Sequence, residues 1–284
     1  MPLIRFRSRS CAPCALLLLL AVSGCETARP VRDLSPTPAA LGQWIWTRAD
    51  VPRYDESSAV HPALEAGVFI GSVRCDTASR RVVARAGLPP ATVAVPHPVA
   101  VIRLEDGLYA CRTVSDSEGV FEQRLDSAVR VLRVRGGNVA YSAVHLDHDA
   151  PQRRLAEWAA SVRYLRSHAL STDTVWVTSI IAHLREPAYG SLFRDVVRGH
   201  VLQVFDTGEL ATPSQVTEAV QLARKAAMPF RVGLGAFERE TSRGRTTHRA
   251  WFAAIPTFAT VPGYAGVWIF PAGQRWVTLY RETL

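Results

Sequence analysis

Several ionisable side chains follow directly on a short apolar run, in the stretch VHLDHDAP at residues 144–151. The residues before it, NVAYSAV, are typical of a β-strand, in which successive side chains point to opposite faces. This alternation predicts that Val144 and Leu146 pack on one face while Asp147 and Asp149 point to the other. Two carboxylates at the end of a buried strand suit general acid–base chemistry on a glycosidic bond. Asp147 and Asp149 are therefore candidate catalytic residues.

Further candidates stand at the ends of other apolar runs. Glu238 follows the run PFRVGLGAF at 229–237 and is a third candidate catalytic carboxylate. Glycosidases with barrel folds commonly carry carboxylates after the fourth and seventh strands, which is where these residues would lie. Tryptophans can stack on sugar faces, and charged side chains can bind sugar hydroxyls. The expected substrate-binding residues are Trp46, Arg48, Arg74, Glu105, Asp206 and Trp268.

Each of these residues also has a purely structural interpretation. Asp149 can cap the helix that is expected to begin near residue 151. Asp147 can neutralise Arg74 or Arg103, because buried charges need partners, and the same alternative holds for Glu105. The stretch FERETSRGR at 237–245, which contains the third carboxylate, is typical of a solvated loop. The two tryptophans of the run at 42–48 suit a core as well as a binding surface.

Metal and nucleophile chemistry are less well supported. A metal site would draw its nitrogen and oxygen ligands from His145, Asp147, Asp149 and His183. No HExxH or HxH spacing accompanies them, and no GxSxG motif marks a nucleophilic serine. We therefore expect neither a metal nor a cofactor.

Eight apolar runs rich in valine, isoleucine and aromatic residues predict eight strands. Amphipathic stretches between them predict helices, so strands and helices alternate as in parallel βα units. Eight such units in about 240 residues indicate a single closed (β/α)₈ barrel, with catalytic groups at the carboxyl ends of its strands. The alternative is an open doubly wound sheet, but no glycine-rich phosphate motif follows the first strand. The expected strands are 42–48, 66–74, 98–105, 138–147, 173–184, 199–206, 229–237 and 264–273, and the expected helices are 117–137, 151–170, 188–199 and 212–228.

An ordered set of motifs resembles a known family. The early WIWTR, the strand end HLDHDAP, the run VLQVF and the late GVWIF are similar to those of the bacterial lipoprotein family called domain of unknown function 3142. The resemblance covers roughly residues 42–275 and implies an exported, barrel-like fold related to glycoside hydrolases. It assigns no catalytic residue. The fifth run ends in AHL where the family is expected to carry a tryptophan.

The first 24 residues predict a lipoprotein signal peptide. Three arginines precede the apolar run CALLLLLAV at 14–22, which is too short to be a transmembrane helix. The run leads into VSGC, a lipobox in which the Cys25 thiol would receive a diacylglycerol; an ordinary signal peptide is the alternative. Glu26, instead of aspartate, favours the outer membrane. The expected organisation is a signal peptide at 1–24, a lipidated proline-rich tether at 25–41 and the barrel at 42–284.

Charge and cysteine content narrow the functional classes. The net charge of +8 includes three leader arginines, and the remaining arginines are scattered without a basic stripe. We therefore expect no nucleic-acid binding. Cys75 and Cys111 would follow neighbouring strands in an oxidising compartment, so we expect a disulfide between them.

These observations favour a lipid-anchored protein of the bacterial envelope, facing the periplasm, that acts on or binds carbohydrate. The membrane contact would be the lipid on Cys25, and the ligand would be a polysaccharide or peptidoglycan. The rival interpretation is a non-catalytic glycan-binding or scaffold lipoprotein, in which the carboxylates only balance arginines.

Overall fold

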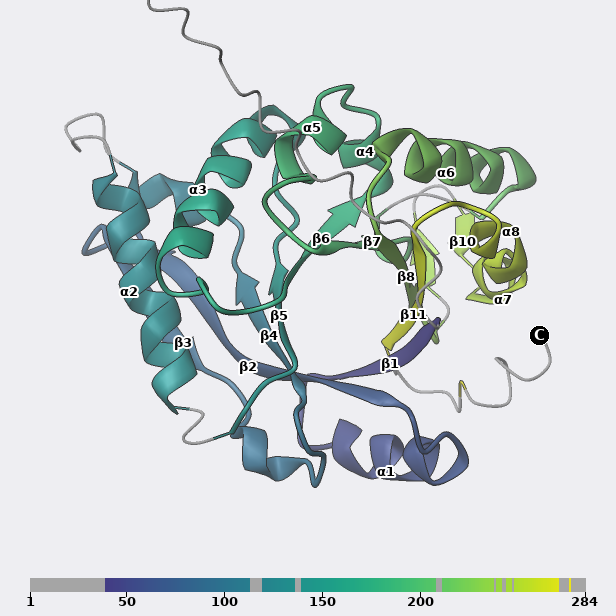
Figure 1. Ribbon diagram of the computed structural model, residues 1–284, viewed down its shortest axis with the longest axis horizontal. Coiled ribbons are helices and arrows are strands. Elements are labelled where there is room, and N and C mark those ends of the chain that lie inside the picture. Colours follow the sequence, from purple (N-terminus) through teal and green to yellow (C-terminus); the bar gives the residue numbers. More distant parts are fainter. Residues whose placement is uncertain are drawn as a thin grey trace, which may run out of the picture. The chain divides into compact units, whose positions relative to one another are not determined.

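A computed structural model describes residues 39–112, 119–135, 139–207, 211–237, 239–241, 244–246 and 248–270, together with Trp276. Eight parallel strands form a closed ring with helices around it (Figure 1), which confirms the (β/α)₈ barrel. The ring closes because β1 pairs with both β2 and β11. In barrel order the strands are β1 (Ala40–Ile45), β2 (Glu65–Asp76), β4 (Val99–Leu104), β5 (Ala143–Asp147), β6 (Val175–Ile180), β7 (Gly199–Gln203), β8 (Phe230–Gly235) and β11 (Tyr264–Phe270).

The helices agree with the sequence in part. The stretches expected at 117–137, 151–170, 188–199 and 212–228 contain α2, α3, α5 and α6, while α1, α7 and α8 were not expected from the sequence. The expected strand at 173–184 is too long, because β6 ends at Ile180 and the next residues form α4. The helices are α1 (Asp50–Val60), α2 (Val120–Arg135), α3 (Leu155–Ser167), α4 (Ile181–Leu184), α5 (Tyr189–Phe193), α6 (Pro213–Ala226), α7 (His248–Ala253) and α8 (Ile255–Ala259).

Short elements complete the described chain. Three 3₁₀ turns lie at Pro90–Thr92, Leu108–Cys111 and Gln152–Arg154. A separate two-stranded sheet pairs β9 (Arg239–Thr241) with β10 (Gly244–Thr246). The first strand begins at Ala40, two residues before the expected start of the domain, so a fragment beginning at residue 42 would lack part of β1. In the described residues no helix is long and apolar enough to cross a bilayer.

Side chains along the barrel wall alternate as expected for strands. On β5, Val144 and Leu146 pack with the core that the helices cover, while Ala143 belongs to a second cluster inside the ring. His145 also points inward, because its ring contacts Trp44 and Trp268. The interior of the ring is therefore filled by side chains and is not a channel.

A buried tryptophan fills the lower part of this interior. Trp268 is 1% exposed, and it lies against two glycines on neighbouring strands. A Cβ atom at Gly42 would lie 2.6 Å from the indole, and one at Gly67 would lie 2.1 Å from it. Below it, the Arg231 guanidinium stacks at 4.5 Å from the Trp176 ring centroid and 5.4 Å from that of Trp268. Only residues without a side chain at positions 42 and 67 leave room for this indole.

One hairpin extends the wall beyond the barrel. β2 continues past the ring and pairs antiparallel with β3 (Arg81–Ala86), a strand that was not expected from the sequence. The expected disulfide joins the end of β2 to the turn after β4, with 2.03 Å between the sulfurs of Cys75 and Cys111. It closes a loop of 36 residues, and constraint of the unfolded chain contributes about 3–4 kcal/mol for a loop of this size.

Candidate functional site

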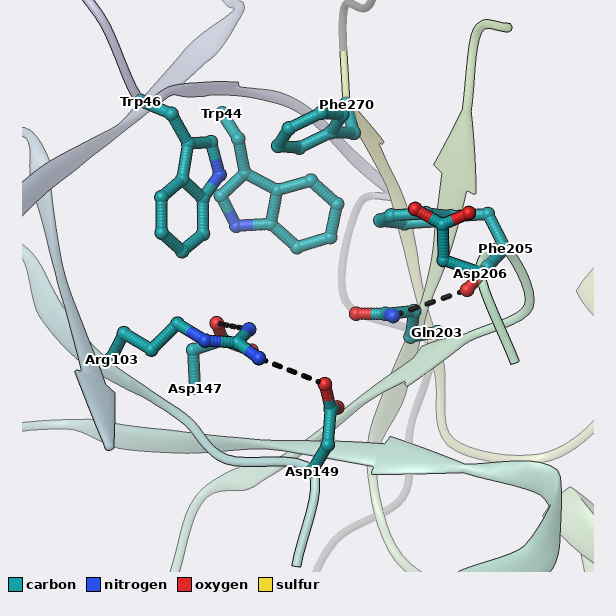
Figure 2. A pocket seen from close by; sticks show the side chains of 9 residues that line it. All are labelled: Trp44, Trp46, Arg103, Asp147, Asp149, Gln203, Phe205, Asp206 and Phe270. Carbon is teal, nitrogen blue, oxygen red and sulfur yellow. Dashed lines mark hydrogen bonds and ion pairs between the residues drawn. The ribbon is translucent and has the colours of Figure 1, made fainter. Parts of the chain in front are cut away.

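A pocket of about 300 Å³ opens at the carboxyl ends of the barrel strands (Figure 2). This is the end at which barrel enzymes carry their active sites. Its aromatic side chains gather on one side, and an arginine with two aspartates faces them from the other. The described lining residues are Trp44, Trp46, Arg103, Asp147, Asp149, Gln203, Phe205, Asp206 and Phe270.

An arginine on β4 holds both expected catalytic aspartates. Arg103 donates from Nη1 to Asp147 Oδ2 at 2.7 Å and from Nη2 to Asp149 Oδ2 at 3.1 Å. Strand register explains this contact, because Arg103 and Asp147 are direct partners across β4 and β5. Burial alone would lower the pKa of Arg103, but the two carboxylates outweigh it and raise that pKa above its usual range. The guanidinium therefore stays charged and bound to both carboxylates.

Asp147 belongs to a directional chain of hydrogen bonds. Trp44 Nε1 donates to His145 Nδ1 at 3.4 Å, so the imidazole carries its proton on Nε2 and donates to Thr178 Oγ1 at 2.9 Å. The Thr178 hydroxyl then donates to Asp147 Oδ1 at 2.7 Å. Burial lowers the pKa of His145 to about 4, which keeps the ring neutral and consistent with this pattern. With Arg103 on its other oxygen, Asp147 is fully bonded and only 4% exposed.

Asp149 differs from Asp147 in both contact and charge. Its Oδ1 is buried and has no hydrogen-bond partner among the described residues, while about a third of its side chain is exposed. Burial raises the pKa of Asp149, and the nearby Asp147 charge raises it further, against the lowering effect of Arg103. The expected helix cap is wrong, because α3 begins only at Leu155 and neither it nor the preceding turn has a side-chain cap. Asp149 is thus easier to protonate than an ordinary aspartate, as a group that holds and releases a proton must be.

Four aromatic rings form the opposite side, here called the aromatic wall: Trp44, Trp46, Phe205 and Phe270. The Phe270 ring centroid lies 5.6 Å from that of Phe205, 6.1 Å from Trp46 and 6.4 Å from Trp44. The Trp46 ring also stacks on Phe69 at 4.6 Å. Its Nε1 is buried and has no partner among the described residues. The wall therefore offers apolar ring faces to the pocket, while the Trp46 Nε1 donor is buried behind them.

The structure brings together only some of the predicted residues. Trp46, Asp147, Asp149 and Asp206 line the pocket. The side chain of Trp268 points inward but lies below the pocket, in the filled interior. The remaining predicted residues do not line it: Arg48 and Arg74 are exposed, Glu105 accepts a hydrogen bond from Ser72 at 2.6 Å, and Cys25 and Glu238 lie outside the described residues.

Three lining residues were missed by the sequence analysis: Gln203, Phe205 and Phe270. All three stand at or just after the ends of β7 and β11. The alternation used above for Val144 and Leu146 would have found Phe270, which shares its face with Trp268. Aromatic side chains at the carboxyl ends of barrel strands are the signal that was available.

The possible metal ligands do not converge. His183 Nε2 lies 2.6 Å from the Ala150 carbonyl oxygen, and its ring stacks on Tyr189 outside the pocket, whereas His145 points into the barrel. Across the described ranges no group of three or more metal-ligating side chains occurs.

Comparisons with known proteins bear on the fold. No family model and no curated protein matches the sequence. Among solved structures, the chain is similar to the spore cortex-lytic enzyme SleL of Bacillus cereus, with a TM-score of 0.57 and 13% identity over 87% of this chain and 74% of that one. A mutant GH18 chitinase of Cycas revoluta in complex with (GlcNAc)4 gives a TM-score of 0.58 and 11% identity over 86% and 99%. A xylanase–α-amylase inhibitor protein with trehalose gives 0.54 and 8% over 87% and 97%.

Identities this low show the fold alone. The chain therefore shares the (β/α)₈ barrel fold of these solved structures, GH18 chitinases among them.

Proposed function

We propose that the protein is carbohydrate-active and that its pocket binds one end or one residue of a glycan. The observation that carries this proposal is the composition of the pocket, in which the aromatic wall faces the carboxyl groups of Asp147 and Asp149. Sugar rings present apolar C–H faces for stacking and hydroxyl groups that both donate and accept. A bound sugar would place a C–H face on these rings and a hydroxyl group beside Asp149, about a third of whose side chain is exposed.

In this proposal Asp149 acts as the general acid. Its raised pKa makes this carboxyl group easier to protonate than an ordinary aspartate, and the carboxyl proton passes to the glycosidic oxygen as the bond from that oxygen to the anomeric carbon breaks. The carbon then accepts a water molecule, or first the substrate's own acetamide oxygen in substrate-assisted families such as GH18. Asp147, held in place by Arg103 and Thr178, stabilises the positive charge that develops on the sugar. Asp206, which also lines the pocket, is available to accept the proton of the water.

A specific observation favours a second candidate function, glycan binding without hydrolysis. Both Asp147 and Asp149 accept hydrogen bonds from Arg103, so part of their charge is already balanced. The solved structures to which the chain is similar include a xylanase–α-amylase inhibitor protein as well as chitinases. Turnover separates the two candidates.

Substitution Asp149→Asn is expected to reduce hydrolysis of a bound oligosaccharide by about 100-fold or more, the scale of a lost general acid. Binding should persist, because the amide keeps the shape of the carboxyl group. The measurement is a binding and hydrolysis screen of the purified full-length protein in mild detergent, with the exposed Asp195→Asn as control. Binding without turnover by the wild-type protein would select the second candidate, and absence of any glycan binding would refute the proposed function.

We also propose that Cys25 carries a lipid and anchors the protein to the envelope, with the outer membrane as the favoured site. The VSGC motif supports this, as does the resemblance to the lipoprotein family named above. Substitution Cys25→Ala is expected to release the protein from membranes or to leave it as unprocessed precursor. Membrane fractionation and intact mass measure this, and a normally processed, membrane-bound variant would contradict the proposal.

A further inference from the structure

A helix on the outside of the barrel exposes two neighbouring valines. Among the residues that the structure describes, the exposed large apolar side chains are Val60, Val131 and Val134. Val131 and Val134 lie three residues apart on α2, so they share one face of that helix, and Val134 is 77% exposed. An isolated exposed valine is ordinary on a protein surface, so the meaning of this pair depends on the residues around it.

The exposed residues around these valines are basic or uncharged. At 3.6 residues per turn, the exposed residues of α2 fall on one continuous arc of about 140°. They are Gln123, Arg124, Ser127, Arg130, Val131, Val134 and Arg135. Both acidic residues of the helix lie outside this arc and are engaged. Glu122 pairs with Arg112, while Asp126 accepts from Arg130 Nε at 2.7 Å and from the Ala169 N–H. The exposed face of α2 therefore combines apolar and cationic side chains without a carboxylate.

The two valines and the arginines beside them, Arg130 and Arg135, are here called the α2 patch. Arg130 keeps about half of its side chain exposed despite its pair with Asp126, and Arg135 is exposed as well. Figure 1 shows α2 on the outside of the ring, beside α3. The α2 patch is therefore open to a partner that attracts positive charge and takes up apolar side chains.

The α2 patch lies toward the end of the barrel opposite the pocket. In a parallel barrel, each helix runs back from the carboxyl end of one strand to the amino end of the next. α2 leads in this way from β4 to β5, which begins at Ala143, so the last turns of α2 lie nearest the amino ends of the strands. β1 also begins at that end, at Ala40, and the chain leads from there back to Cys25.

The surface of a membrane with anionic phospholipids matches this composition. Apolar side chains of a peripheral helix enter the interfacial region of a bilayer, and arginines are attracted to its negative surface. A patch this small binds a bilayer only weakly by itself. A lipid on Cys25 would make docking intramolecular, so weak contacts are sufficient. The chain from Cys25 to residue 39, the first that the structure describes, spans at most roughly 45–50 Å, which keeps the barrel close to the bilayer.

We infer that the α2 patch docks on the anionic phospholipid surface of the membrane to which the chain is anchored. This inference rests on the proposed lipid at Cys25 and goes beyond the proposed glycan binding. Docking through α2 turns the amino ends of the barrel strands toward the bilayer. The pocket, at the carboxyl ends, then opens away from the membrane, where a glycan can reach it.

The test measures whether α2 of the anchored protein contacts lipid. The full-length lipidated protein carries Val134→Cys labelled with a polarity-sensitive dye. Labelling is selective because Cys75 and Cys111 are joined in a disulfide and Cys25 would carry the lipid. In vesicles of phosphatidylethanolamine and phosphatidylglycerol the label should emit at shorter wavelength than in vesicles of phosphatidylcholine alone. It should also be protected severalfold from acrylamide, an uncharged quencher.

Matched variants test the position and the charge of the contact. Val60→Cys places the same dye at another exposed valine, on α1, whose exposed residues include Asp55, and its label should be quenched equally in both kinds of vesicle. Arg135→Glu should remove most of the protection of the Val134 label. Arg224→Glu reverses a charge in the last turn of α6 instead and should leave that protection unchanged. Added salt should reduce the protection by screening.

The other results overturn the inference. Equal quenching of the Val134 label in both kinds of vesicle would show that the α2 patch stays in water although the anchor holds. Equal protection of the two labels would show lipid contact without a preference for α2. Protection that appears in detergent and grows with protein concentration would show that a second copy of the chain covers the α2 patch. Protein that does not float with the vesicles would overturn the proposed anchor as well, and none of these results affects the proposed glycan binding.

Discussion

Lowering the pH from 7 to 5 is expected to reduce the free energy of unfolding by about 5 kcal/mol. Burial lowers the pKa of His145 and His183 to about 4 and that of His200 to about 3, from an ordinary value of 6.5. The unfolded chain therefore binds protons at a higher pH than the folded one. The contribution of these three neutral histidines to the free energy of unfolding is complete above pH 6.5 and is lost as the pH falls toward 4. Each histidine costs about 2 kcal/mol at pH 5, against a typical total of about 5–15 kcal/mol.

The environment of His200 makes it the best probe of this effect. Its Nδ1 lies 2.6 Å from Ser179 Oγ, its ring contacts those of Tyr189 and Phe230, and its Nε2 has no partner among the described residues. A charged ring there has almost no solvation. This burial between barrel and helices, rather than any role in the pocket, makes it sensitive to acid.

Urea unfolding at pH 7, 6 and 5 measures the effect. His200→Gln removes one titrating group, so the difference in stability between pH 7 and pH 5 should shrink by about 2 kcal/mol even if the variant is weaker at pH 7. Val177→Ala, a cavity variant in the fully buried core, should lose stability equally at both pH values. Equal stability of the wild-type protein at pH 5 and pH 7 would contradict the prediction.

Substitution Asp147→Asn is expected to lower the free energy of unfolding by about 3–5 kcal/mol, the cost of breaking a buried ion pair from one side. An amide cannot satisfy both neighbours. If its nitrogen faces Arg103, two donors oppose each other. If it faces Thr178, the hydroxyl already accepts from His145 Nε2 and loses the acceptor for its own proton. Either orientation leaves a buried group without a partner.

Urea unfolding of Asp147→Asn and of the control Asp195→Asn measures this cost, with glycan binding and turnover followed in parallel. The exposed control should change stability by less than about 0.5 kcal/mol. A variant of nearly wild-type stability that has lost turnover would instead identify Asp147 as a catalytic residue. This distinguishes the structural interpretation from the catalytic one, which the sequence left open.

The barrel was predictable because its strands carry a strong signal. Parallel strands buried on both faces appear as nearly continuous apolar runs, and all eight runs coincide with barrel strands. The β2–β3 hairpin gave no such signal, since β3 is an edge strand with exposed arginines at positions 81 and 85. The helices α1, α7 and α8 are short or weakly amphipathic, so their sequences carry no strong helical pattern.

The sequence predicts which side chains point into the barrel, but not how far along the barrel axis each of them lies. Alternation along β5 correctly predicts that Asp147 points inward. It cannot tell how high a residue lies in the barrel, so Trp268, two positions before the end of β11, was expected at the mouth and lies in the floor. Arg74 was expected there too, but it belongs to the part of β2 that has left the ring. Such heights depend on strand stagger, which is a property of the closed barrel and not of one strand.

Because Trp268 fits tightly against Gly42 and Gly67, substitutions at these three positions depend on one another during evolution. An alanine at either glycine has no room while the indole is present, and a smaller residue at 268 leaves a void that the glycines cannot fill. Single substitutions at any of the three are therefore penalised, although paired replacements can restore the packing. Among descendants of this chain, positions 42, 67 and 268 should change together or remain as they are.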